Sequence, residues 1–196
     1  MIMPARLVGV NGDMMLKKIA LMMMCVALIS CGSDAPEVPP VTGVPDPGEA
    51  VADQALQLSV KGEHVAAIAL FQQAAEQGNR PAQYYLGLYY ARGESVDQDF
   101  GKAFHWLERA SLGGHPKAMY HLGEMYVHGD GIAVDHVKAM AWFWTATTLG
   151  ERYAEKRLRA VAPRLSQDEI AEAKVLSKEL YSNMPLDMKI ERVQLH

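Results

Sequence analysis

A repeat with a period of 36 residues dominates the middle of the chain. Residues 81–116 align with residues 117–152, and Gly, Trp, Asp and Lys recur at equivalent positions. Asp99, for example, aligns with Asp135, and Trp106 aligns with Trp142. Periods of 20 to 50 residues are typical of architectures in which each unit packs on its neighbour, so the chain is expected to build its core by stacking such units.

Each unit predicts two helices. Ala82, Leu86 and Tyr90 recur at i, i+4 and i+8, which places them on one apolar stripe of a first helix. Gly93 is placed as the end of that helix, and Asp99 as the N-cap of a second helix, where its carboxylate accepts backbone N–H groups. Neither helix can bury its stripe alone, so the pairs must stack.

Two further features refine this prediction. Gly87 and Gly123 lie inside the first helices, where glycine costs about 1 kcal/mol relative to alanine, so we expect another helix to approach closely there. Beyond the repeats, Ser166 and Glu169 form a capping box that opens a helix ending near Tyr181. A solenoid needs a terminal helix to cover its last open face, and this helix is placed to do so.

The pattern A-x3-LG-x2-Y-x2-G-x5-D-x2-KA-x2-W-x3-A, present twice, resembles the Sel-1-like repeat, a longer relative of the tetratricopeptide repeat. Ser95 departs from it, since it stands at a turn position where the second unit has Gly131. The resemblance implies an all-α fold, a short α-solenoid of about four antiparallel helix pairs with a C-terminal capping helix. We place the repeat domain at residues 48–182 and a tail at 183–196.

The first 30 residues are predicted to be a signal peptide, with Met14 or Met15 as the more plausible start. Lys17 and Lys18 precede an uncharged apolar run of about 12 residues, which spans about 18 Å as a helix and is too short for the ~30 Å membrane core. The run ends in Leu-Ile-Ser-Cys31, which resembles the bacterial lipobox and implies lipidation of Cys31. An ordinary cleaved signal is the alternative.

Residues 31–47 are predicted to combine the lipidated Cys31 with a proline-rich tether. Five of the ten prolines fall within residues 33–48, a composition that favours extended backbone and prevents helix formation. Gly32 follows the cysteine, and in lipoproteins of this kind Asp at that position favours the inner membrane. The resemblance therefore implies a lipid-anchored protein of the bacterial cell envelope, in the outer membrane and facing the periplasm.

Protein segments are the expected ligands of the solenoid. If first helices line the concave surface as in tetratricopeptide repeats, residues just off the apolar stripe form a groove of mixed character, which suits a peptide or protein partner. These residues are Tyr84, Leu88, Arg92, Tyr120, Glu124 and His128. Tyr85, Tyr89 and Trp144 also fall off the repeat positions and are expected to be freer for ligands, whereas Trp106, Trp142, Tyr90 and Tyr126 are expected in the core.

Sites of chemistry are not predicted. His121, Glu124 and His128 could hold zinc only weakly, and His105, His115 and His136 are interpreted as solvated polar positions. No nucleophile elbow or phosphate-binding loop occurs, so we expect no catalytic residue, no cofactor and no metal.

The formal net charge of −4 argues against nucleic acid as a partner. The basic set Arg152, Lys156, Arg157, Arg159 and Arg164 could meet anionic lipid or an acidic partner, or form a solvated helix face. The sequence thus predicts a non-catalytic scaffold or adaptor for other envelope proteins, held at the membrane through Cys31. The alternatives are a hydrolase or binding protein for cell-wall peptide or glycan, and a purely structural or inhibitory lipoprotein.

Overall fold

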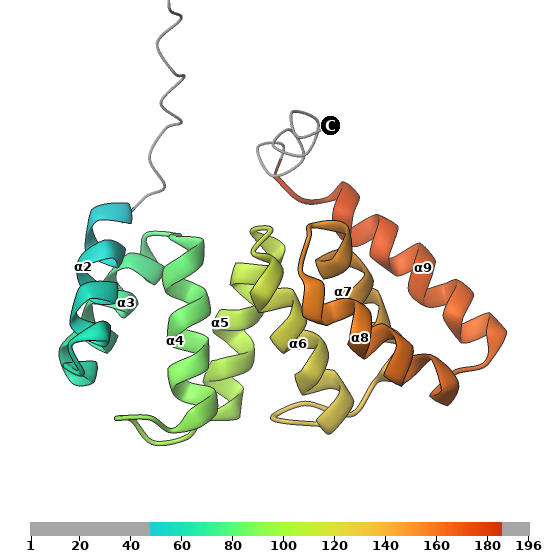
Figure 1. Ribbon diagram of the computed structural model, residues 1–196, viewed down its shortest axis with the longest axis horizontal. Coiled ribbons are helices and arrows are strands. Elements are labelled where there is room, and N and C mark those ends of the chain that lie inside the picture. The colour runs from blue at the N-terminus through green and yellow to red at the C-terminus, as the bar shows by residue number, and fades with distance from the viewer. Residues whose placement is uncertain (1–47, 186–196) are drawn as a thin grey trace, which may run out of the picture. The chain divides into compact units, whose positions relative to one another are not determined.

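The computed structural model describes residues 48–185, and this part of the chain is helical (Figure 1). The predicted signal peptide, Cys31 and the tether lie outside the described residues, as do residues 186–196 of the predicted tail. The helices are α2 (Glu49–Val60), α3 (His64–Glu76), α4 (Arg80–Arg92), α5 (Phe100–Leu112), α6 (Pro116–His128), α7 (His136–Thr148), α8 (Arg152–Val161) and α9 (Gln167–Ser182), with a 3-10 turn η1 (Ala162–Arg164). None of them is both long and apolar enough to cross a membrane.

The helices pack in consecutive pairs, as the repeat predicts. The main contacts are α2 with α3, α4 with α5, and α6 with α7, and each pair joins the next through α3 with α4, α5 with α6, and α7 with α8. The core between them is built on small residues at equivalent positions, each fully buried: Ala67, Ala103 and Ala139; Ala74, Ala110 and Ala146; Ala82, Ala118 and Ala154. The predicted all-α solenoid is confirmed.

Helix ends follow the predicted pattern. Asp99 and Asp135 cap α5 and α7, where their Oδ1 atoms accept hydrogen bonds of 2.9 Å from the backbone N–H groups of the third helical residues. Gly93 and Gly129 end α4 and α6 with φ of 66° and 79°. This left-handed conformation suits glycine because a Cβ would clash with the backbone. Ser166 forms the predicted capping box with Glu169.

The glycines inside the first helices mark close contacts between helices. A Cβ on Gly87 would lie 2.7 Å from Cγ of Leu107, and one on Gly123 would lie 2.6 Å from Cε1 of Phe143. Leu107 and Phe143 are both buried, so neither side chain has open space to move into. The cost of a helical glycine is therefore offset by tight packing of α4 on α5 and of α6 on α7.

The last helix, α9, is the predicted capping helix and packs on the preceding pair. The main contact of α9 is with α7, and the hydroxyls of Ser177 and Thr145 lie 3.1 Å apart across that interface. Pro163 lies in the 3-10 turn that redirects the chain after α8, and Ala173 of α9 is buried in the same apolar cluster as α7. The terminal helix thus covers α7 rather than forming an antiparallel pair with α8.

Candidate functional site

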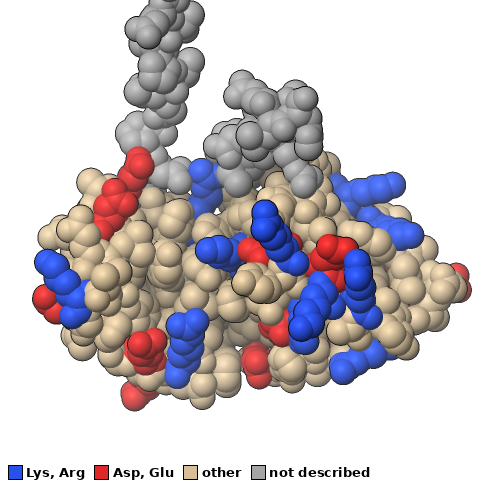
Figure 2. Space-filling view, in the orientation of Figure 1, with Lys and Arg blue, Asp and Glu red and all other residues tan. Residues whose placement is uncertain are grey.

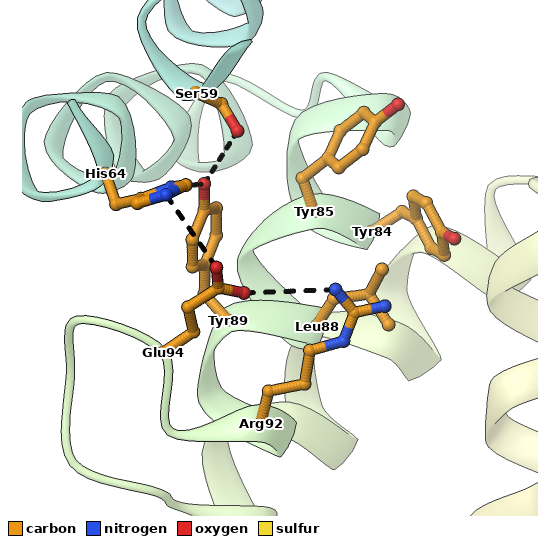
Figure 3. A pocket seen from close by; sticks show the side chains of 8 residues that line it. All are labelled: Ser59, His64, Tyr84, Tyr85, Leu88, Tyr89, Arg92 and Glu94. Atoms are coloured by element: carbon orange, nitrogen blue, oxygen red, sulfur yellow. Dashed lines mark hydrogen bonds and ion pairs between the residues drawn. The ribbon is translucent and has the colours of Figure 1, made fainter. Parts of the chain in front are cut away.

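A cavity of about 310 Å³ lies where α4 meets the turn between α2 and α3 (Figure 3). Tyr84, Tyr85, Leu88 and Arg92 line it from successive turns of α4. They face it because residues three and four apart share one side of a helix. Tyr89 of α4 and three polar residues from outside that helix complete the wall: Ser59, His64 and Glu94.

A chain of polar contacts holds one end of this cavity together. The hydroxyl of Tyr89 lies 2.8 Å from Oγ of Ser59 and 2.9 Å from Nδ1 of His64. Nε2 of His64 lies 3.8 Å from one carboxylate oxygen of Glu94, and Arg92 approaches the other at 3.9 Å. The last two contacts are long and partly exposed, so they can rearrange when a ligand offers a better partner.

A second cavity, of about 300 Å³, adjoins the first and shares Tyr84 and Tyr85 with it. Its wall is more apolar and draws on four helices or their leading turns: Leu56, Pro81, His115, Pro116, Lys117, Leu149, Gly150 and Glu151. We call the two adjoining cavities the tyrosine groove. It runs across α4 from the α2–α3 turn to the start of α8.

Two histidines beside the groove are held in the neutral form. Burial lowers the pKa of His115 from 6.5 to about 4, with nearby Lys117 and Arg80 acting in the same direction. Burial also lowers the pKa of His121 to about 4, and Arg92 contributes. The ring of Tyr84 stacks on His115 at 4.6 Å between centroids. At neutral pH this part of the groove is therefore an uncharged aromatic surface.

The structure separates the six predicted groove residues into two groups. Tyr84, Leu88 and Arg92 lie together in the first cavity. On α6, by contrast, Glu124 forms an ion pair with Arg157 of α8 and lies 3.7 Å from His128. The groove is instead bounded on the α6 side by residues at the start of that helix. Glu124 thus ties α6 to α8, and Tyr120 lies against Phe143 of α7.

One expectation about aromatic exposure was wrong. Tyr89 is only 5% exposed, since its ring packs near Phe71 and only its hydroxyl reaches the cavity. Trp142 is buried as expected, and Trp106, Tyr90 and Tyr126 are half-buried and pack against the core. Lysine ammonium groups lie over both tyrosine rings, which favours a position at the edge of the core.

His115 was also wrongly expected to be a solvated position. It is the N-cap of α6, with its Nδ1 accepting a hydrogen bond of 3.2 Å from the backbone N–H of Ala118. Asn79 and Glu151, one period before and after it, cap α4 and α8 in the same way. These three caps lie 36 residues apart, so the period predicts their equivalence. They were not recognised from the sequence because asparagine, histidine and glutamate occupy the three positions.

The weak zinc set is not assembled around a common point. His121 packs against Tyr84 and Tyr120, whereas Glu124 is occupied by Arg157. Across residues 48–185, no group of three or more His, Cys, Asp or Glu side chains is arranged to hold a metal ion. The sequence did not predict three of the groove residues, Ser59, His64 and Glu94. Ser59 and His64 belong to the first helix pair and Glu94 to the turn after α4, where the repeat pattern is weak.

The geometry defines a class of protein: a helical-repeat solenoid with a groove across its first helices. The profile of the Sel1 repeat matches residues 56–79, 80–115 and 116–150. The chain is 37% identical to a Sel1 repeat protein from Oxalobacter formigenes, covering 58% of this chain and 88% of that one, with a TM-score of 0.54. This chain belongs to the Sel1 repeat family.

A second solved structure agrees with this assignment. It is a protective antigen present in uropathogenic Escherichia coli strains that displays an SLR fold, with 27% identity and a TM-score of 0.69. The alignment covers 76% of this chain but only 33% of the antigen, so the chain spans about a third of that relative. A search among curated proteins found no match. Sel1 repeats are tetratricopeptide-related helical scaffolds that commonly serve protein–protein interaction.

Proposed function

We propose that this chain is a lipid-anchored, non-catalytic scaffold of the bacterial cell envelope, in the outer membrane and facing the periplasm, that binds an extended segment of a partner protein. The observation that carries the proposal is the tyrosine groove, in which two cavities share Tyr84 and Tyr85. The anchoring part is supported by the lipobox-like residues that end at Cys31.

The size and lining of the groove favour a peptide segment. Each cavity is near 300 Å³, which accommodates a few side chains but not a folded surface. The shared tyrosine wall offers rigid aromatic contact, and Arg92 and Lys117 offer charged groups at either end. Successive side chains of an extended segment could therefore enter the two cavities in turn.

The groove's chemistry supports binding over catalysis. Tyr89, Ser59 and His64 are hydrogen-bonded to one another rather than arranged around an open reaction centre. The alternative of a hydrolase for cell-wall peptide or glycan would depend on His121, Glu124 and His128, and the carboxylate of Glu124 is engaged by Arg157. No observation on the described residues favours that alternative.

Cross-linking and affinity capture from membranes would test the scaffold. Arg92→Ala is the primary variant because its side chain is 62% exposed, so its removal leaves the core intact. Tyr85→Ala is the second, and we expect either one to reduce capture of the partner at least tenfold, as loss of a central Arg or Tyr does in other interfaces. Tyr153→Ala, which is 74% exposed on α8 and lies outside the groove, is the matched control.

The outcomes separate the two parts of the proposal. If Arg92→Ala and Tyr85→Ala fold like wild type and capture the same partner equally well, the groove is not the binding site. Cys31→Ser tests the anchor on its own, since it should move the protein from the membrane to the soluble fraction. Membrane association that persists in Cys31→Ser would contradict lipid anchoring at that residue.

A further inference from the structure

A line of positive charge runs along the outer face of α8. Residues 151–164 carry five Lys or Arg and two Glu, although the whole chain has a net charge of −4. Arg152, Lys156 and Arg159 fall at i, i+4 and i+7, so they share one side of the helix, and all three are exposed. Figure 2 shows Lys and Arg side chains gathered over α8. We call these three residues the α8 stripe.

Most of this charge is available to a ligand. Arg157 points to Glu124 of α6 and is half-buried, so it serves the fold. Arg159 pairs with Glu155 on the same helix, where both side chains are well exposed. Arg152 and Lys156 make no ion pair with any residue between 48 and 185. Exposed pairs contribute little to stability, so retaining these charges has no evident structural benefit.

An apolar slot opens at the end of the stripe. It has a volume of about 250 Å³ and lies between α7, α8 and α9, left open because α9 packs against α7 instead of α8. Its lining residues are Met140, Trp144, Leu158, Ala162 and Ile170, with Glu155 and Arg159 at the rim. The ammonium group of Lys174 lies 5.3 Å from the centre of the Trp144 ring. The slot is therefore apolar inside, with the Glu155–Arg159 ion pair at its rim and the Lys174 ammonium group beside Trp144.

We propose that the α8 stripe and the slot dock the solenoid onto an anionic phospholipid surface. The stripe meets the phosphate groups, and the slot receives part of an acyl chain. The exposed cations of the α8 stripe form a row on an open surface, which fits an array of lipid headgroups better than it fits one peptide. The apolar slot beside this row fits the acyl part of an anionic amphiphile. The inference rests on the membrane anchoring proposed above, which would keep the protein at a lipid surface.

Fluorescence quenching in vesicles tests this docking. Lipidated full-length protein, isolated from membranes, is reconstituted into vesicles whose acyl chains carry bromine, a quencher of tryptophan. The vesicles contain phosphatidylcholine alone or an equimolar mixture with phosphatidylglycerol. We expect quenching only in the anionic vesicles, and its loss as salt is raised. Trp144→Phe should remove most of the quenching while α8 amides remain protected from hydrogen exchange.

Neutralising the stripe gives the quantitative test. Each cation near an anionic surface contributes about fivefold, so changing Arg152, Lys156 and Arg159 to Gln should weaken docking roughly a hundredfold. The control changes three exposed lysines elsewhere, Lys61, Lys102 and Lys138, to Gln, which removes the same charge and should leave docking unchanged.

Three results would overturn the inference. These are equal quenching in neutral and anionic vesicles, equal loss of docking in the stripe and control variants, and a stripe variant that loses capture of an acidic protein while it keeps lipid docking. Failure of the wild-type protein to stay with vesicles of either kind would instead count against the lipid anchor, which belongs to the proposed function.

Discussion

Acid should destabilise the solenoid through His115, and His115→Asn should remove that effect. The pKa of this histidine is lowered to about 4 in the folded protein, against 6.5 in the absence of the fold, chiefly because its ring is buried. Its Nδ1 also accepts the backbone N–H of Ala118, and protonation would abolish that cap and place a cation at a helix N-terminus. The neutral ring is thus part of the folded state.

The difference between the folded and unfolded pKa of His115 sets how much the free energy of unfolding falls in acid. Above pH 6.5 the ring is neutral in both states, so the full stability is present. As the pH falls from 6.5 towards 4, the unfolded chain binds a proton that the folded chain does not, and the free energy of unfolding decreases by about 1.4 kcal/mol per unit. By about pH 5, His115 therefore lowers the free energy of unfolding by about 2 kcal/mol. The pKa of His121 is shifted in the same way, so His121 lowers the free energy of unfolding by a similar amount.

Urea denaturation at about pH 7.5 and about pH 5 measures the effect. Asparagine is the right replacement because Asn79 occupies the equivalent position one period earlier and caps α4 through its side chain at 2.9 Å. We expect wild type to lose about 2 kcal/mol more than His115→Asn on acidification. The comparison concerns the change with pH, so loss of the stacking on Tyr84 does not affect it. Equal losses would show that folding does not lower the pKa of His115 and would refute the reasoning.

The remaining predictions concern equivalent repeat positions. Ser95 adopts a φ of 63°, which is unfavourable for any residue but glycine, so Ser95→Gly should raise the free energy of unfolding by about 1 kcal/mol. Gly131→Ala, at the matching position, should lower it by at least that amount, since its Cβ would lie 2.8 Å from the backbone of Phe100. Gly123→Ala should cost about 1–3 kcal/mol through overlap with Phe143, despite the better helix propensity of alanine. Calorimetric melting of each variant checks all three, and a higher melting temperature for Gly123→Ala would contradict the packing account.

Much of the fold could be predicted because the repeat encodes local structure. Asp99 and Gly93 were assigned to helix ends from their place in the period, and short-range hydrogen bonds and left-handed backbone put them there. Gly87 was expected at a close helix contact, and Leu107 fills the space that its missing side chain leaves. Such features depend on a few neighbouring residues, so one sequence is enough to recognise them.

The candidate site was only partly predictable. A period identifies which residues are equivalent, but the curvature and twist of the stack decide which of them meet across units. The period puts Tyr84, Arg92 and Glu124 at comparable places, but Tyr84 and Arg92 line the first cavity whereas Glu124 pairs with Arg157 of the following unit. That ion pair joins positions 33 residues apart, off the 36-residue register. The sequence predicted a capping helix after the last repeat, but not that it would pack on α7 rather than on α8.

The packing of α9 on α7 also determines which helices open first. In a row of helices that mainly contact their neighbours, local opening begins at an end and spreads inward. The main partner of α2 is α3 alone, whereas α7 contacts α6, α8 and α9. Backbone amides of α2 should therefore exchange with solvent deuterium first, and those of α7 last. Local unfolding should therefore begin at the N-terminal helix and proceed toward the C-terminal helices, where α9 holds α7 in place.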